Sequence, residues 1–301
     1  MPTTSRIVQG LMRVDSIDAE RLYQLIRYDL DHGVDYFDTA DCYGMGQSES
    51  LIGDVLLANP ELREKMFLQT KCSIVKDRFG RSYYDLSKKH ILEAVEASLS
   101  RLKTDFVDCL LLHRPDIFLN PKEVAEAFQE LHKAGKVRSF GVSNFPKETI
   151  EYLLEEVNVP IILNQVQFGL GHLCLAQEAV NNNLLHDNGV NRTGELLYYM
   201  KRKHIALQAW SPFQKGFFEG SIFDESRFPE LNNALRAMAE RYMTSRCAVA
   251  TAFILALGED VSVVTGSTNV EHVQECIDGL SVHLSKEDWY SLYRAAGANL
   301  P

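Results

Sequence analysis

Between residues 106 and 113 the chain reads FVDCLLLH, a short and mainly apolar run that ends in a histidine. Amphipathic stretches of helical length flank this run on both sides, at Leu86–Arg101 and Pro121–Ala134. Their apolar residues recur at spacings of three and four, as on one face of a helix. An apolar strand between two such helices predicts a parallel sheet covered by helices.

The same alternation runs from one end of the chain to the other. Further helical stretches are Asp18–His32 and Pro146–Glu155. The predicted strands are Ile7–Leu11, Tyr36–Ala40, Met66–Lys71, Phe106–His113, Ser139–Ser143, Ile162–Val166, Ala206–Ser211 and Val261–Gly266. Eight strand–helix repeats predict an α/β fold of the (β/α)8 TIM-barrel class.

The main alternative is an open, doubly wound sheet, which has the same local alternation. That fold normally carries a glycine-rich phosphate turn after its first strand. Here the first strand leads into Gly10-Leu11-Met12-Arg13, and the chain contains no GxGxxG. No linker rich in Pro, Gly or Ser divides the chain, so we expect a single domain over residues 1–301.

Two segments are additional to the eight strand–helix repeats of a barrel: Asn181–Gly194 and Phe213–Phe228. The second follows the seventh strand, and loops after strands lie at the active-site end of a barrel. It contains four phenylalanines, Phe213, Phe217, Phe218 and Phe223. We therefore expect extra loops and helices at the C-terminal face, with this segment as an apolar wall of the ligand site.

Composition excludes several classes of protein. Of 301 residues, 46% are hydrophobic and 24% are charged, which is ordinary for a globular chain. The net charge of -10 argues against a broad nucleic-acid or anionic-lipid surface. The N-terminus lacks a signal-peptide pattern, and no apolar run reaches the about 20 residues that span a bilayer, so a cytoplasmic location is expected. The six cysteines show no CxxC spacing, so we expect free thiols and no metal site.

Polar residues at or just beyond the ends of the predicted strands are the candidates for chemistry, because these ends face the active site of a barrel. The second strand contains Asp38 and is followed by Tyr43, the third ends in Lys71, and the fourth ends in His113. Each has a structural alternative: Asp38 as a helix cap, Tyr43 and His113 as core residues, and Lys71 as a solvent-exposed cation.

Together, these four residues indicate a site in which a tyrosine donates a proton to the substrate. Reducing a carbonyl by hydride transfer leaves negative charge on the oxygen, which a tyrosine can neutralise. A nearby ammonium such as Lys71 lowers a tyrosine's pKa from about 10, and Asp38 would keep that ammonium charged and oriented. His113 would hydrogen-bond the carbonyl oxygen and stabilise its developing charge.

The segments around these residues resemble those of the aldo-keto reductase family, especially its bacterial oxidoreductases. The matching segments, in the family's order, are Phe37–Gly44, Gln69–Lys71, Leu111–Asp116, Gly141–Phe145, Asn164–Val166, Ala209–Pro212 and Gly266–Ser267. The resemblance implies a barrel enzyme that uses NAD(P)H to reduce aldehydes or ketones. It makes Asp38, Tyr43, Lys71 and His113 the catalytic four, with Tyr43 as general acid.

The resemblance also implies contacts to the nicotinamide. Ser143, Asn144 and Gln165 match positions that hydrogen-bond its carboxamide, which needs both donors and acceptors. Trp210 matches an aromatic position that stacks on the ring, although a core tryptophan is the alternative. Ser211, next in the chain, would approach the pyrophosphate through its backbone.

The segment expected to bind the adenosine end of the cofactor departs from the family pattern. Gly266 and Ser267 would receive the adenosine phosphate at a helix start. Family members that prefer NADPH commonly have Lys or Arg where this chain has Gly266 and His272. A neutral histidine binds a 2'-phosphate more weakly than arginine, so NADPH is the family default with NADH as the alternative. Glu275 fits a position that contacts adenine.

Two hypotheses follow. The main one is an enzyme that acts on a small-molecule carbonyl, as a monomer or weak oligomer, without nucleic-acid or membrane partners. The other is a cofactor-binding redox sensor or regulatory subunit with little turnover, because a fold does not fix a function.

Overall fold

The computed structural model describes residues 5–181, 190–216 and 219–298. Eight of its strands form one closed parallel barrel, in the order β1-β10-β9-β8-β7-β6-β3-β2. Their bounds are β1 Ile7–Gly10, β2 Tyr36–Asp38, β3 Phe67–Cys72, β6 Val107–Leu112, β7 Val137–Ser143, β8 Ile161–Gln167, β9 Ala206–Trp210 and β10 Val261–Thr265. Each predicted strand is present within one or two residues at either end, which confirms the (β/α)8 barrel.

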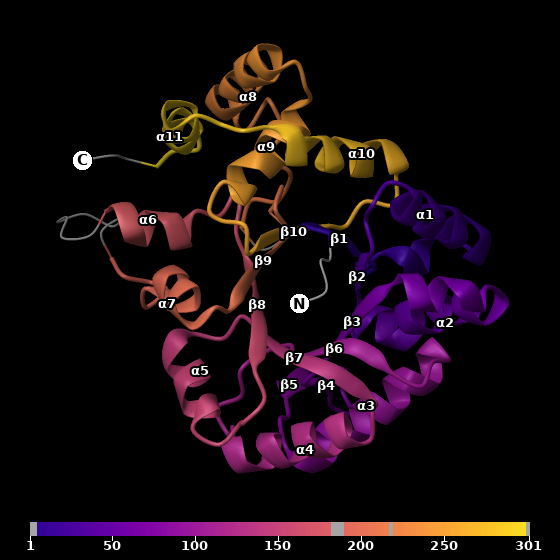
Figure 1. Ribbon diagram of the computed structural model, residues 1–301. Helices are drawn as coiled ribbons and strands as arrows, with labels where there is room; N and C mark the ends of the chain where they lie inside the picture. The colour runs from indigo at the N-terminus through magenta and orange to yellow at the C-terminus, as the bar shows by residue number, and fades with distance from the viewer. Residues whose placement is uncertain (1–4, 182–189, 217–218, 299–301) are drawn as a thin grey trace. The chain divides into compact units, whose positions relative to one another are not determined.

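Helices follow the strands along the chain, as Figure 1 shows. Their bounds are α1 Ala19–Asp31, α2 Gln47–Ala58, α3 Lys88–Leu102, α4 Pro121–Lys133, α5 Lys147–Leu154, α6 Cys174–Val180, α7 Leu196–Lys203, α8 Pro229–Tyr242, α9 Arg246–Leu255, α10 Val270–Asp278 and α11 Lys286–Ala295. The helices predicted from periodicity are confirmed, with ends that differ by one or two residues. None of the helices within the described ranges is long and apolar enough to cross a membrane.

The chain divides into two compact units. The first comprises residues 1–165 and 266–270, and the second comprises residues 166–265 and 271–301. The predicted catalytic residues all belong to the first unit. The expectation of a single domain stays a prediction.

Several helices of the first unit start at residues that favour a helix N-terminus. Asp18 accepts a hydrogen bond from the backbone N–H of Arg21 (2.8 Å) at the start of α1. Ser87 caps α3 in the same way, and Pro121 occupies the first position of α4, where its missing N–H costs nothing. These helices bury their apolar faces, and so fix the strands whose ends carry the site.

Helices α2 and α3 approach each other closely at Gly53. A Cβ built on this residue would lie 2.0 Å from the carbonyl oxygen of Arg101 in α3. Any side chain at this position would force the two backbones apart. The close approach keeps Arg101 beside the loop that follows β2.

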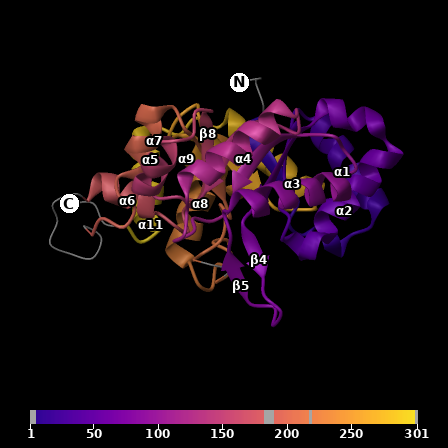
Figure 2. The ribbon, with the colours of Figure 1, turned by 90° about the horizontal axis from the view of Figure 1, so that it is seen from below.

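A short antiparallel hairpin, β4 Ile74–Lys76 and β5 Ser82–Tyr84, is an addition that the sequence analysis missed. Figure 2 shows it extending away from the strands and helices of the first unit. Phe79 at its turn is 66% exposed, and Tyr83 and Tyr84 are also exposed.

The two predicted extra segments belong to the second unit. Most of Asn181–Gly194 lies outside the described residues, as do Phe217 and Phe218. Within Phe213–Phe228, the rings of Phe213 and Phe223 lie with centroids 5.5 Å apart. Helix α8 begins at Pro229, directly after this segment. Its role as a wall of the ligand site stays a prediction.

Candidate active site

The strands of the first unit place three of the four predicted catalytic residues at the same end of the barrel. Asp38 is the last residue of β2 and pairs with Gln69 of β3. Lys71, two residues further along β3, pairs with Leu111 of β6, and His113 directly follows β6. Because neighbouring parallel strands end together, their C-terminal residues meet at one end of the barrel.

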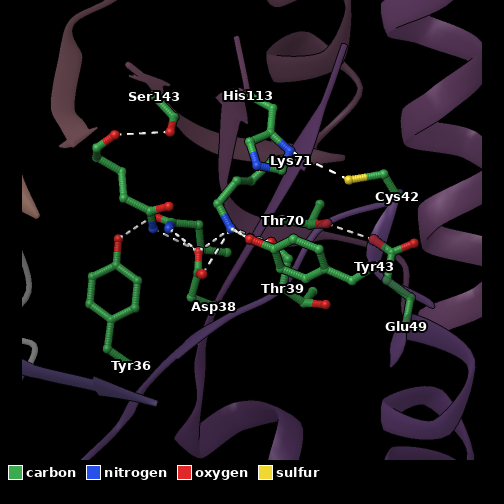
Figure 3. Close-up of polar contacts among 12 residues, drawn as sticks. Tyr36, Asp38, Thr39, Cys42, Tyr43, Glu49, Thr70, Lys71, His113 and Ser143 are labelled. Carbon is green, nitrogen blue, oxygen red and sulfur yellow. Dashed lines mark hydrogen bonds and ion pairs between the residues drawn. The ribbon is translucent and has the colours of Figure 1, made fainter. Parts of the chain in front are cut away.

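The Lys71 ammonium lies at the centre of the site (Figure 3). Its Nζ lies 2.7 Å and 2.8 Å from the two carboxylate oxygens of Asp38. It also donates to the carbonyl oxygen of Thr39 (2.7 Å) and to the hydroxyl of Tyr43 (3.2 Å). Burial alone would lower the pKa of Lys71, but the adjacent Asp38 carboxylate outweighs burial and raises it. Lys71 is therefore a permanent cation, and it is fully buried.

Tyr43 lies in a short 3-10 segment, Tyr43–Gly46, which follows β2. Gly46 has a φ of +88°, and a Cβ there would lie 2.9 Å from the Arg101 side chain, so glycine suits both the turn and the packing. Burial raises the pKa of Tyr43, and Lys71 only partly offsets this effect. The sequence analysis expected Lys71 to lower this pKa. Its influence has the expected sign, but burial is larger, so Tyr43 stays protonated at neutral pH.

His113 presents one ring nitrogen to Cys42. The distance between His113 Nδ1 and Cys42 Sγ is 3.7 Å. The rings of Tyr43 and His113 lie edge to face with centroids 5.7 Å apart. Burial, reinforced by the positive charge of Lys71, lowers the pKa of His113 well below its ordinary value. The imidazole is therefore neutral at neutral pH.

Two further side chains surround Asp38, and the sequence analysis assigned no role to them. Gln69 donates to Asp38 Oδ1 (2.5 Å), and the hydroxyl of Tyr36 donates to the Gln69 amide oxygen (2.6 Å). Period-two alternation was a usable signal, because Tyr36 lies two residues before Asp38 and Gln69 two before Lys71.

The three residues predicted to bind the nicotinamide lie next to this cluster. Gln165 Nε2 donates to Asp38 Oδ1 (3.0 Å). Ser143 Oγ donates to the carbonyl oxygen of Gln165 (2.9 Å), and Asn144 Nδ2 donates to Ser143 Oγ (2.9 Å). Asn144 also donates to the carbonyl oxygen of His113 (3.4 Å). These contacts bring all three residues to the four predicted catalytic residues.

The remaining predicted cofactor residues are divided between the units. Gly266 and Ser267 belong to the first unit, where Gln9 Nε2 donates to the carbonyl oxygen of Ser267 (3.0 Å). The others belong to the second unit, where Trp210 ends β9, Ser211 has a φ of +45°, and His272 and Glu275 lie in α10.

A buried ion pair lies behind the loop that carries Tyr43. Glu49 is fully buried, accepts a hydrogen bond from Thr70 Oγ1 (2.6 Å) and pairs with Arg101 at 2.7 Å.

Three side chains near this loop have raised pKa values. Burial and the Glu49 carboxylate raise the pKa of Asp41 to about 7. Burial raises the pKa of the Cys42 thiol to about 11 and that of Cys72 well above its ordinary value. Both thiols are therefore protonated at neutral pH, despite the nearby lysine.

A protein-family model described as the aldo/keto reductase family matches residues 6–296 of this chain. The chain is 35% identical over 307 residues to YcsN, an uncharacterized oxidoreductase of Bacillus subtilis (strain 168), with 99% of this chain and 96% of YcsN covered. It is 32% identical over 300 residues to a 6-dehydroglucose reductase of Agrobacterium fabrum (strain C58), with 97% and 94% covered. A solved aldo/keto reductase from Klebsiella pneumoniae, in complex with NADP and acetate, has a TM-score of 0.75 at 24% identity, with 98% and 93% covered.

Proposed function

Because this chain belongs to the aldo/keto reductase family and is an oxidoreductase, we propose that it reduces the carbonyl group of a small molecule, with NADPH as the hydride donor and Tyr43 as the general acid. The observation that carries this proposal is the position of Lys71 Nζ, which contacts both Asp38 (2.7 Å) and the Tyr43 hydroxyl (3.2 Å). A buried cation beside a protonated phenol stabilises the phenolate, and so helps the phenol to donate its proton.

When bound, the nicotinamide would supply the hydride that the carbonyl carbon accepts. The carbonyl oxygen then gains negative charge and takes the proton of Tyr43. The charge of Lys71 stabilises the phenolate that remains. Asp38 keeps Lys71 charged and oriented, assisted by the amides of Gln69 and Gln165. Alcohol oxidation uses the same groups in reverse.

His113 positions the substrate. Its imidazole is neutral, and Nδ1 faces Cys42. With the proton on Nε2, the ring donates a hydrogen bond to the carbonyl oxygen and stabilises the charge that develops there.

The groups beside the four catalytic residues suit a nicotinamide carboxamide. Ser143, Asn144 and Gln165 supply hydroxyl and amide groups, which include the donors and acceptors that a carboxamide needs. Trp210, Ser211, Gly266, Ser267, His272 and Glu275 are assigned to the rest of the cofactor by the family resemblance. NADPH is the family default, and NADP is bound in the Klebsiella structure of the same fold.

The test is calorimetric titration of the purified protein with NADPH and with NADH. It is followed by absorbance at the reduced nicotinamide band with a panel of carbonyls, which includes 6-dehydroglucose and aliphatic and aromatic aldehydes. We expect tighter NADPH binding and substrate-dependent oxidation. Binding without turnover on any carbonyl would favour the sensor hypothesis, and binding of neither cofactor would overturn the proposal.

A further inference from the structure

Three potential metal ligands meet beside the catalytic residues. Asp41 and Cys42 lie in the loop after β2, and His113 follows β6. One ligand atom from each lies within 4.8 Å of the other two. Figure 3 shows the Cys42 sulfur directed at the His113 ring. The spacing of the cysteines predicted no such cluster, because its histidine is 71 residues away from Cys42.

The distance between two of these ligand atoms fits a tetrahedral metal site. Zinc binds sulfur at about 2.3 Å and imidazole nitrogen at about 2.0–2.1 Å. A tetrahedral angle between such bonds separates sulfur and nitrogen by about 3.6 Å. Cys42 Sγ and His113 Nδ1 are 3.7 Å apart. The two side chains are thus already placed to share one ion.

Asp41 supplies an oxygen that is not otherwise used. Its Oδ1 is buried and has no hydrogen-bond partner within the described part of the chain. Its backbone N–H donates to the carbonyl oxygen of Lys71 (3.1 Å), which fixes the loop against β3. A buried carboxylate oxygen without a partner is unfavourable, and a metal ion would satisfy it.

We propose that Asp41, Cys42 and His113 form a binding site for one divalent transition-metal ion of the zinc type, with water as the fourth ligand. Three protein ligands and one open position are typical of zinc sites that exchange a ligand, and a thiolate disfavours Mg²⁺ and Ca²⁺. On binding, the Cys42 thiol releases its proton to solvent, and the Nδ1 lone pair of His113 coordinates the ion. Asp41 and Cys42 are only half-buried, so the ion can enter from solvent.

This site does not depend on the proposed function, but its expected effect on catalysis does. The ion takes up the Nδ1 lone pair of His113 and fixes the ring, so that Nε2 can no longer adjust to the carbonyl oxygen of the substrate. It therefore inhibits carbonyl reduction.

The direct test is titration of the protein, under reducing conditions, with Co²⁺ as a spectroscopic substitute for Zn²⁺. We expect a thiolate-to-cobalt charge-transfer band and the visible bands of a tetrahedral site, both displaced by Zn²⁺. Cys42→Ser should lose the charge-transfer band. Cys174→Ser, which removes another half-buried cysteine, is the matched control and should retain it. No band in the unmodified protein, or a band that persists in Cys42→Ser, would overturn the proposal.

Two further measurements guard against a variant that fails to fold. Zn²⁺ should protect Cys42 of the unmodified protein from alkylation, as read by peptide mapping, and equal labelling with and without Zn²⁺ contradicts the site. Asp41→Asn should weaken Co²⁺ binding by at least about tenfold, and unchanged affinity would remove the carboxylate from the ligand set. Cobalt binding without inhibition of turnover would leave the binding site in place and overturn its expected effect on catalysis.

Discussion

Two clusters in the first unit are built around a buried aspartate and its cations, at opposite ends of the strands. Asp38 is the last residue of β2, whereas Asp108 lies near the start of β6. Asp108 accepts from Arg63 (2.8 Å), Arg138 (2.9 Å) and the backbone N–H of Leu68 (3.0 Å). Both guanidinium groups also lie over one ring, that of Phe106, at 4.0 Å and 3.7 Å from its centroid.

The clusters differ in what their cations contact. Lys71 has a second neighbour with a proton to give, the Tyr43 hydroxyl. The guanidinium groups at Asp108 instead bind the carboxylate and backbone oxygens and cover an aromatic ring. Under the proposed function, the same type of charge pair thus serves chemistry at the C-terminal ends of the strands and stability at their N-terminal ends, a division that is usual in barrels.

Replacement of Tyr43 by Phe, in the Asp38 cluster, should have the largest effect on activity of the variants considered. We expect kcat for carbonyl reduction to fall by about 10²–10⁴-fold, because the general acid is lost. The free energy of unfolding should change by only about 1 kcal/mol, the contribution of one hydrogen bond. Steady-state kinetics and urea unfolding measure the two effects. Tyr152→Phe, at an exposed tyrosine of the same unit, is the control, and near-normal turnover in Tyr43→Phe would refute the assigned role.

Replacement of Asp108 by Ala should have the opposite profile. It leaves Arg63, whose side chain is only 11% exposed, without its carboxylate. We expect a loss of about 3–5 kcal/mol in the free energy of unfolding, with kcat unchanged for the protein that remains folded.

Arg138→Ala is the matched control for Asp108→Ala, because the Arg138 side chain is 61% exposed. It should cost about 1 kcal/mol or less. Equal losses in the two variants, or a large fall in kcat for Asp108→Ala, would remove the distinction between the clusters.

A third buried aspartate, Asp29, contrasts with both clusters, because no cation that the structure describes offsets the effect of burial on its pKa. Asp29 of α1 is fully buried, and neither carboxylate oxygen has a hydrogen-bond partner among the residues that the structure describes. Burial raises its pKa to about 8 from an ordinary 3.8. Between these pH values the folded state keeps a proton that the unfolded chain releases, so stability is lost as pH rises, by at most about 1.4 kcal/mol per pH unit.

Asn at position 29 has no such proton to lose. The difference in Tm between Asp29→Asn and the unmodified protein should therefore grow in favour of the variant from pH 5 to pH 8, as measured by thermal melts across this range. Asp31→Asn, at a site 63% exposed in the same helix, should show no such trend. A constant difference for Asp29→Asn would show that this carboxylate has a normal pKa.

Much of the fold was predictable because buried barrel strands are short apolar runs with few alternatives. The hairpin β4–β5 was missed because its strands are three residues each, largely exposed, and carry no apolar run. Asp29 could have been found, since it follows Leu25 and Ile26 at helical spacing and so lies on the buried face.

The proximity of the four predicted catalytic residues could be predicted, because neighbouring parallel strands end at the same side of a barrel. The Asp108 cluster had no such signal, because Arg63, Asp108 and Arg138 are far apart in the sequence and begin no recognisable motif. The meeting of Cys42 with His113 depends on side-chain direction in a loop with positive φ angles, which neither periodicity nor spacing specifies.

The order of the functional residues along the chain has a consequence for how such proteins diverge. Asp38, Tyr43, Lys71 and His113 all precede residue 165, whereas Trp210, Ser211, His272 and Glu275 follow it. Recombination between related genes near this point would exchange residues assigned to the cofactor and leave the acid–base residues intact. Under the proposed assignments, the proton donor and the residues expected to set the cofactor preference would therefore be inherited separately.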